Sequence, residues 1–153
     1  MRIRRAQKGD LDKIVALLAD DELGIKRETL SDPLDRNYHR AFEIINKDEN
    51  QHLMVVENEM KEIVGTLQLT FIQYLTYRGG QRAQIEAVRI GKDMRGKGIG
   101  ELMIKWAIEF SSAKGAHVVQ LTTDKLRPEA LTFYENLGFV PSHEGMKLHI
   151  NQQ

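Results

Sequence analysis

The sequence lacks cysteine altogether. None of the 153 residues is a cysteine, so disulfides, thiolate metal sites and a cysteine nucleophile are excluded. It also lacks a long apolar run, since no stretch approaches the roughly 18 residues that a membrane span needs. The start, residues 1–5, is basic but leads into polar residues, which is not the pattern of a signal peptide. We therefore expect a cytoplasmic protein without membrane contact.

The sequence also lacks an excess of charge of either sign, because it has 22 lysines and arginines and 22 aspartates and glutamates. A neutral chain lacks the basic footprint of a nucleic-acid-binding protein. One stretch, residues 78–97, is nevertheless basic and has only two acids, Glu86 and Asp93. Its cations are Arg78, Arg82, Arg89, Lys92, Arg95 and Lys97. Such a stretch is either a solvated face or part of a site for an anion.

Length and periodicity predict one domain, residues 1–153, without repeats or linkers. Apolar patterns typical of strands occur near Ile3 and over residues 53–57, 63–74, 83–90, 117–123 and 146–150. Helical spacing occurs over residues 10–20, in a segment ending near residue 46, and over residues 98–114 and 128–137. This order predicts an α+β (mixed α/β) fold, in which antiparallel hairpins precede one parallel strand–helix–strand crossover.

The turn formed by residues 95–100, Arg-Gly-Lys-Gly-Ile-Gly, stands between a predicted strand and the clearest predicted helix. Its three glycines leave a backbone without side-chain obstruction, so that consecutive N–H groups can point at one anion. The helix start adds its positive dipole end and unpaired N–H groups, and Arg95 and Lys97 add charge. The turn therefore predicts a site for the diphosphate of a nucleotide-derived cofactor, with a plain flexible turn as the alternative.

Two familiar nucleotide motifs nearly match this turn. The segment from Gly91 to Gly98 resembles a P-loop, but it ends in glycine where serine or threonine must hold magnesium. The segment from Gly96 to Gly100 is GxGxG instead of GxGxxG, and it follows antiparallel strands instead of an opening βαβ unit. Both interpretations are disfavoured, although the first would predict a magnesium-dependent nucleotide hydrolase.

A third pattern matches without a missing residue. Residues 90–100, Ile-Gly-Lys-Asp-Met-Arg-Gly-Lys-Gly-Ile-Gly, resemble the acetyl-CoA motif of the GNAT superfamily of N-acetyltransferases. Residues 130–139, Ala-Leu-Thr-Phe-Tyr-Glu-Asn-Leu-Gly-Phe, are similar to the C-terminal helix signature of the same family. The resemblance extends from Ile3 to about Ile150. It implies a mixed, mostly antiparallel sheet flanked by helices, with acetyl-CoA as co-substrate.

The resemblance also implies how the cofactor is held. In the family, the strand before the turn and the strand after the helix separate, often at a bulge, and pantetheine lies between them. Its main-chain partners correspond here to Val88 and Ile90, and the Val88 N–H would polarise the thioester carbonyl. The diphosphate would contact residues of the turn, namely Arg95, Gly96, Lys97, Gly98, Ile99 and Gly100.

Acetyl transfer to an amine benefits from a base, and Glu86 is the candidate. A primary amine with a pKa near 10.4 is mostly protonated at pH 7, and neutralising it costs about 4–5 kcal/mol. Strict strand alternation would place Glu86 and Val88 on one face. The position also matches one where related enzymes often carry a glutamate base. The alternative is an edge-strand glutamate paired with Arg89 or Arg82.

Tyr134 matches the tyrosine that the family uses as an acid toward the leaving thiolate, and its alternative is a core aromatic residue. One departure from the family pattern is Arg127, seven positions before Tyr134, where many members have an asparagine that contacts CoA. Its side chain would either reach a phosphate or face water. Because there is no cysteine, we expect direct transfer in a ternary complex and no cysteinyl-acetyl step.

The acceptor is expected to be a small-molecule or peptide amine, bound by residues 20–46 and 71–83. These regions hold acids and tyrosines, which suit a small cationic amine or a solvated loop: Asp20, Asp21, Glu22, Glu28, Tyr38, Tyr74 and Tyr77. No metal is expected, because the histidines show no metal-binding spacing: His39, His52, His117, His143 and His149. A homodimer is left open. The competing hypothesis is a CoA-binding or sensing module without turnover.

Overall fold

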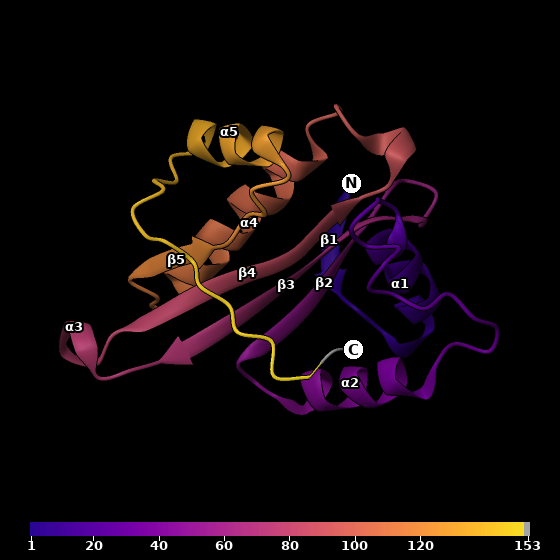
Figure 1. Cartoon of the computed structure of the whole chain (residues 1–153), viewed down its shortest axis with the longest axis horizontal. Helices are drawn as coiled ribbons and strands as arrows, with labels where there is room; N and C mark the ends of the chain where they lie inside the picture. Colours follow the sequence, from indigo (N-terminus) through magenta and orange to yellow (C-terminus); the bar gives the residue numbers. More distant parts are fainter. Residues whose placement is uncertain (152–153) are drawn as a thin grey trace.

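The computed structural model describes residues 1–151, which form a five-stranded sheet in the order β1-β2-β3-β4-β5 (Figure 1). The strands are β1 (Arg2–Arg5), β2 (Gln51–Glu57), β3 (Ile63–Gln73), β4 (Gln81–Ile90) and β5 (Val118–Leu121). Neighbouring strands from β1 to β4 are antiparallel, and β4 pairs with β5 in parallel. The predicted mixed, mostly antiparallel sheet with one parallel crossover is confirmed.

Helices connect and cover these strands. They are α1 (Leu11–Ala19), α2 (Arg36–Lys47), the single turn α3 (Thr76–Gly79), α4 (Ile99–Ala113) and α5 (Pro128–Asn136), with 3₁₀ turns at Lys8–Asp10 and Lys92–Met94. Asp10 holds the N-cap position of α1, but its side chain does not cap the helix. Its carboxylate accepts instead from the Gln7 N–H, 2.7 Å away, and pairs with Arg4.

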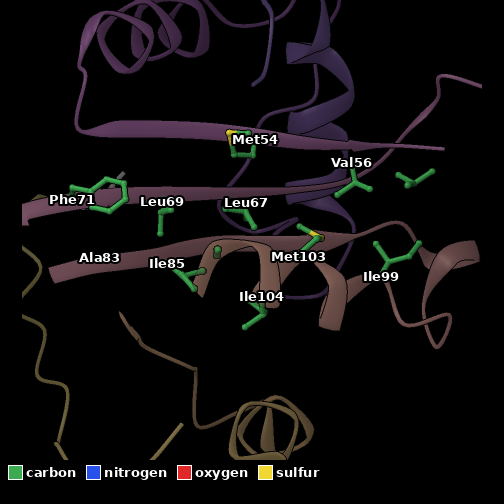
Figure 2. Close-up of a cluster of buried hydrophobic side chains, with 12 residues drawn as sticks. Met54, Val56, Leu67, Leu69, Phe71, Ala83, Ile85, Ile99, Met103 and Ile104 are labelled. Atoms are coloured by element: carbon green, nitrogen blue, oxygen red, sulfur yellow. The ribbon is translucent and has the colours of Figure 1, made fainter. Parts of the chain in front are cut away.

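Apolar side chains pack on both faces of the sheet. On one face, residues of α4 such as Met103 and Ile104 contact strand residues such as Leu67 and Ile85 (Figure 2). On the other face, α1 and α2 pack with Val55 and other buried residues, and this second core includes Leu11, Ile14, Val15, Leu17 and Phe42. The two cores fix the sheet between α4 and α5 on one side and α1 and α2 on the other (Figure 1). Within residues 1–151, no helix has the length and apolar character needed to cross a membrane.

The predicted strand over residues 146–150 is wrong. The structure assigns this segment neither helix nor strand. A strand exists only when a neighbour pairs with its backbone, and alternation in the sequence supplies no neighbour. Its apolar side chains, including Met146 and Leu148, are almost fully exposed in the single chain.

Candidate functional site

The site begins where β4 and β5 part. Their pairing runs from Arg82–Val118 to Ile85–Leu121 and then ends, so that residues 86–90 of β4 have β3 on one side and no strand on the other. Beyond β5 the chain turns away toward α5, which packs over α4 (Figure 1). The separation of strands that the family resemblance implies is therefore present in this fold.

The backbone of β4 is open on this side. The Gly91 N–H donates to the Val64 carbonyl of β3 at 2.9 Å. Because N–H groups alternate in direction along an extended strand, those of Ile90 and Val88 point away from β3. The carbonyls of the same two residues face the same way, and they accept from guanidinium groups: Val88 O from Arg89 Nη1 at 2.8 Å, and Ile90 O from Arg95 Nε at 3.1 Å. An extended ligand can thus add to this edge through the two N–H groups.

A β-bulge lies at the point where β4 and β5 separate. Between the pairs Thr66–Arg89 and Gln68–Glu86, two residues of β4, Ala87 and Val88, oppose one residue of β3. Ala87 has a φ of 53°, the left-handed conformation that non-glycine residues rarely adopt. Such an insertion reverses the side-chain alternation beyond it.

The prediction that Glu86 and Val88 share a face is wrong for this reason. Directly paired residues of an antiparallel ladder share a face, and Glu86 and Arg89 pair with Gln68 and Thr66, which are on one face of β3. Val88 packs instead with Ile85 against the α4 core. Glu86 therefore lies on the α1 face of the sheet, while Val88 lies on the α4 face.

The turn after β4 presents a row of unpaired N–H groups. Gly96 and Gly98 have φ values of 73° and 77°, and a Cβ at either position would meet no atom within 4 Å. Gly98 is the N-cap of α4, and its carbonyl accepts the first helical bond, from the Leu102 N–H. Within the described part of the chain, the N–H groups of residues 96–101 find no hydrogen-bond acceptor. Together with the helix dipole these N–H groups are able to bind an anion, and the diphosphate site at this turn stays a prediction.

Gly100 has a different role in the same turn. A Cβ there would lie 3.1 Å from Ile90 Cδ1 and 3.3 Å from Phe133 Cζ. The absence of a side chain lets the first turn of α4 approach both the end of β4 and α5. Ile99, beside it, is buried in the α4 core. This glycine fixes where the N-terminus of α4 points.

Cations around the turn are partly engaged by the loop after α1. Lys92 Nζ lies 2.9 Å from Asp20 Oδ1, and Arg95 Nη2 lies 3.6 Å from Asp20 Oδ2. Lys97 forms no ion pair with any residue of the range 1–151. Of the two predicted diphosphate cations, Lys97 is therefore the one with an uncommitted charge.

Asp21 joins the loop after α1 to β4 and to the start of α5, a structural role that the sequence analysis did not predict. Its carboxylate accepts from the Leu23 and Gly24 N–H groups and from Arg127 Nη2 at 2.6 Å, and it lies 3.6 Å from Arg89 Nε. Burial opposes ionisation of Asp21, but the Gly24 N–H and the two guanidinium groups outweigh it and hold the pKa below its usual range. Arg127 therefore neither faces water nor stands free for a phosphate in this structure. No local pattern marks Asp21 for this role, because its two guanidinium partners, Arg89 and Arg127, are distant in the sequence.

Tyr134 lies half-buried beside these charges. Its ring contacts Phe133 and Phe139 in edge-on geometry, with centroids 5.1 Å and 5.8 Å away, and it packs against the α4 core with Val88. Burial raises the pKa of its hydroxyl, and the positive charges of Arg89 and Arg127 partly oppose that rise. Its hydroxyl makes no hydrogen bond to any described residue. Tyr134 is thus a protonated acid at neutral pH with an unengaged proton.

Glu86 is exposed and forms no ion pair with any residue in the described range. The expected alternative, a structural pair with Arg89 or Arg82, is not formed: Arg89 turns to Asp21 and Val88 O, and Arg82 lies over the Tyr74 ring. Residues 1–151 include no cluster of histidine and carboxylate side chains able to hold a metal ion. The residues present suit an extended ligand that ends in a diphosphate, as the pantetheine and diphosphate of CoA require.

Comparison with known proteins agrees with this geometry. The model of the acetyltransferase (GNAT) family matches residues 13–139. Aminoalkylphosphonate N-acetyltransferase from Salmonella typhimurium is 28% identical over 142 residues, which cover 92% of this chain and 86% of that protein. A crystal structure described as a transcriptional regulator from Bacillus halodurans is 54% identical, with a TM-score of 0.94 and coverage of 97% and 99% of the two chains.

The fold extends to more distant proteins. Glucosamine-6-phosphate N-acetyltransferase from Arabidopsis thaliana has a TM-score of 0.80 at 22% identity, and 98% of each chain is covered. At that identity the likeness concerns the fold alone. The family match begins within α1 and extends past α5, and it includes the separated strands, the glycine turn and Tyr134. The chain belongs to the acetyltransferase (GNAT) family, whose co-substrate is acetyl-CoA.

Proposed function

We propose that this protein transfers an acetyl group from acetyl-CoA to a primary amine by direct attack in a ternary complex. The observation that carries the proposal is the open edge of β4, which leads directly into the row of unpaired N–H groups at residues 96–101. Bound acetyl-CoA supplies an activated acetyl thioester. The Val88 and Ile90 N–H groups orient its extended part, and the turn together with Lys97 binds the diphosphate.

Glu86 is the proposed base. It is exposed on the α1 face, and no cation in the described range neutralises it. Because of the bulge at Ala87, the side chains of Glu86 and Val88 lie on opposite faces of the sheet. The amine can therefore approach Glu86 from the α1 face, while the Val88 N–H contacts the thioester from the open edge of β4. Glu86 accepts the ammonium proton, either directly or through a water molecule, and releases a neutral amine nitrogen.

Tyr134 is the proposed acid. Burial keeps its hydroxyl protonated at neutral pH, and no described residue takes that proton. As the new C–N bond forms and the C–S bond breaks, the Tyr134 hydroxyl gives its proton to the departing sulfur. Arg89 and Arg127 stabilise the negative charge left on the phenolate oxygen, because both already act on its pKa. The attacking nitrogen loses a second proton as the amide forms, and that proton replaces the one that Tyr134 gave to the sulfur. The proton taken by Glu86 returns to solvent, so that protons balance over a turnover.

For the acceptor, we propose a small primary amine that also carries an anionic group. Three of the four acids expected to attract a cationic amine are engaged: Asp20 pairs with Lys92 and Arg95, Asp21 pairs with Arg127 and Arg89, and Glu28 accepts from the Tyr38 hydroxyl. Glu22, the fourth, is exposed. One carboxylate, Asp21, thus serves two guanidinium groups, and one of these, that of Arg89, belongs to a residue on the same face of the sheet as Glu86. The Salmonella relative named for aminoalkylphosphonates supports the same choice.

The test is a free-thiol release assay with acetyl-CoA across an amine panel. The panel contains an aminoalkylphosphonate, an amino acid, a polyamine, an aminoglycoside and a lysine peptide, and the cysteine-free protein adds no thiol background. We expect turnover to be fastest with the aminoalkylphosphonate or amino acid. Faster turnover of the polyamine would contradict the anionic-acceptor proposal. Calorimetric binding of acetyl-CoA without turnover of any amine would favour a sensing module.

Replacing Glu86 with glutamine tests the base. We expect Glu86→Gln to lower kcat/KM at neutral pH by about 10²-fold or more. The matched control is Glu109→Gln, which removes an exposed carboxylate from α4. A kcat/KM that Glu86→Gln lowers no more than Glu109→Gln does would remove Glu86 from the mechanism.

A further inference from the structure

Three arginines gather where the loop after α1 meets β4 and the start of α5. Arg127 Nη2 lies 2.6 Å from Asp21 Oδ2, and Arg89 Nε lies 3.6 Å from the same oxygen. Arg27 Nη2 lies 3.7 Å from Asp124 Oδ2. Burial lowers the pKa of Arg89, and the positive charges of Arg127 and Arg27 lower it further, although Asp21 opposes the shift. These five side chains together carry three positive charges and two negative ones.

Most hydrogen-bond donors of Arg89 and Arg127 are unused. A guanidinium group has five N–H donors. Among the described residues, the Arg89 side chain donates one hydrogen bond, to Val88 O at 2.8 Å, and the Arg127 side chain donates one, to Asp21 Oδ2 at 2.6 Å. Arg89 Nε is buried and has no hydrogen-bond partner in the same part of the chain. Because buried donors are ordinarily satisfied, the two guanidinium groups have room for a further acceptor.

The two guanidinium groups lie beside the proposed reacting groups. The Val88 carbonyl faces the open edge of β4, so its hydrogen bond holds the Arg89 guanidinium at the edge where the thioester is proposed to lie. Glu86 and Arg89 pair with Gln68 and Thr66, which are two residues apart on one face of β3. Two residues of a strand span about 7 Å. A carboxylate without a counter-charge therefore stands close to a cluster with an excess positive charge, and the two together complement a small zwitterion.

We propose that Arg89 and Arg127 bind the anionic group of the acceptor while its amine lies at Glu86, and that Asp21 positions the two guanidinium groups. This inference rests on the proposed function and adds which residues select the acceptor. A carboxylate and a phosphonate share the oxygen atoms that guanidinium groups bind in pairs. The close spacing of Glu86 and Arg89 selects acceptors in which a short carbon chain joins the amine to the acid, such as aminoethylphosphonate and β-alanine.

The first test compares three amines of similar chain length in the thiol-release assay: aminoethylphosphonate, β-alanine, and propylamine, which has no acidic group. We expect the better of the two acidic amines to exceed propylamine in kcat/KM by about tenfold or more. Which of the two is better distinguishes a phosphonate from a carboxylate as the bound group. Equal kcat/KM for the three amines overturns this inference and leaves acetyl transfer to amines intact, whereas no turnover of any amine overturns both.

Arg127→Gln tests the residue assignment, because it removes the charge and keeps a polar side chain. We expect it to reduce the preference for the acidic amine by about tenfold or more, chiefly through KM, and to leave the Kd of acetyl-CoA unchanged. A role through Tyr134 alone would lower kcat for all three amines alike, and a contact with CoA would raise the Kd. The matched control, Arg2→Gln, removes an exposed arginine from β1 and should keep the preference. A preference that survives in folded Arg127→Gln overturns the proposal.

Inhibition by ethylphosphonate and propionate tests the same subsite in the unmodified protein. Each of these anions has the acidic group of one acceptor and no amine. We expect the anion that matches the better acceptor to inhibit competitively toward that amine and not toward acetyl-CoA. This measurement decides the question even where Arg127→Gln fails to fold. Absence of inhibition, or competition with acetyl-CoA alone, overturns the proposal.

Discussion

At the residue scale, Ala87 determines how the site is divided. Its left-handed conformation adds one residue to β4 relative to β3, and the faces of the following residues are reversed. Glu86 and Val88 consequently lie on opposite faces, with the proposed base on the α1 side and the polarising N–H at the open edge. Alanine is not a residue type typical of this conformation, so nothing in the local sequence predicts the bulge.

His52 is a residue whose environment gives stability a pH dependence. Its side chain is buried between Phe71 and Phe110, with ring centroids 5.6 Å and 5.1 Å away, and its Nε2 has no partner among the described residues. Burial lowers its pKa, as do the positive charges of Arg5 and Lys114. The unfolded chain therefore binds a proton near pH 6.5 that the folded chain does not bind.

This difference in proton binding determines the direction in which stability changes with pH. Above about pH 6.5, His52 is neutral in both states and contributes no pH dependence; as the pH falls below it, the unfolded state is favoured until the lowered pKa of the folded state is reached. We expect the urea midpoint to be lower at pH 5.5 than at pH 7.5. His52→Phe keeps an aromatic ring at this position, and its urea midpoint should fall less than that of the unmodified protein between pH 7.5 and pH 5.5. Equal losses in both proteins would show that His52 is not responsible.

At the element scale, the turn between β4 and α4 is the feature whose proposed anion binding is most fully specified by the sequence. Gly96 and Gly98 supply the positive φ values, Gly100 supplies the close approach to Phe133, and α4 supplies the dipole. Each contribution is a property of the backbone, so the motif is visible in the sequence. Its cations are less well specified, because Arg95 divides its guanidinium between Ile90 O and Asp20.

Gly98 and Gly115, at the two ends of α4, form a matched pair for testing this turn. Both have positive φ values, 77° and 87°, and at both a Cβ would meet no atom within 4 Å. Gly98→Ala and Gly115→Ala should therefore each lower the free energy of unfolding by about 1–2 kcal/mol. Only Gly98→Ala places a methyl group beside the unpaired N–H row, and it should weaken acetyl-CoA binding by about tenfold or more, which is about 1.4 kcal/mol. Calorimetry that finds the same Kd for both variants would refute the assignment of the turn.

At the scale of the whole molecule, Asp20 and Asp21 connect the two sides of the sheet. They follow α1, which packs on one face, and they pair with residues of the β4–α4 turn and with Arg127 at the start of α5, on the other face. These ion pairs thereby join the proposed CoA site to the loop that is proposed to bind the acceptor, and two of the cations involved, Arg89 and Arg127, act on the pKa of Tyr134. A displacement of the loop over residues 20–35 would alter the charges around Tyr134.

A double-mutant cycle on Asp21 and Arg127 measures this connection. Both side chains are about three-quarters buried, at 23% and 25% exposure, so we expect a coupling free energy of about 1–2 kcal/mol, between the values for exposed and buried pairs. Asp21→Ala should be the more destabilising single change, because it also leaves Arg89 without its counter-charge. A second cycle on the exposed pair Arg27–Asp124 serves as the control and should give less than about 1 kcal/mol. Coupling no larger than in this control would show that the network does not join the two sides.

The sequence by itself determined the order of the elements, the glycine turn and the family. Strand alternation, helical spacing and backbone freedom at Gly96 and Gly98 are local properties, so local patterns report them. Only the tertiary structure decided the face of Glu86, the partners of Asp21 and Arg127, and the absence of a strand at residues 146–150. Each of these depends on residues that are distant in the sequence. The face of Glu86 depends on how β3 pairs with the bulge, the Asp21–Arg127 pair joins distant segments, and a strand at residues 146–150 would need a neighbouring strand that the single chain does not supply.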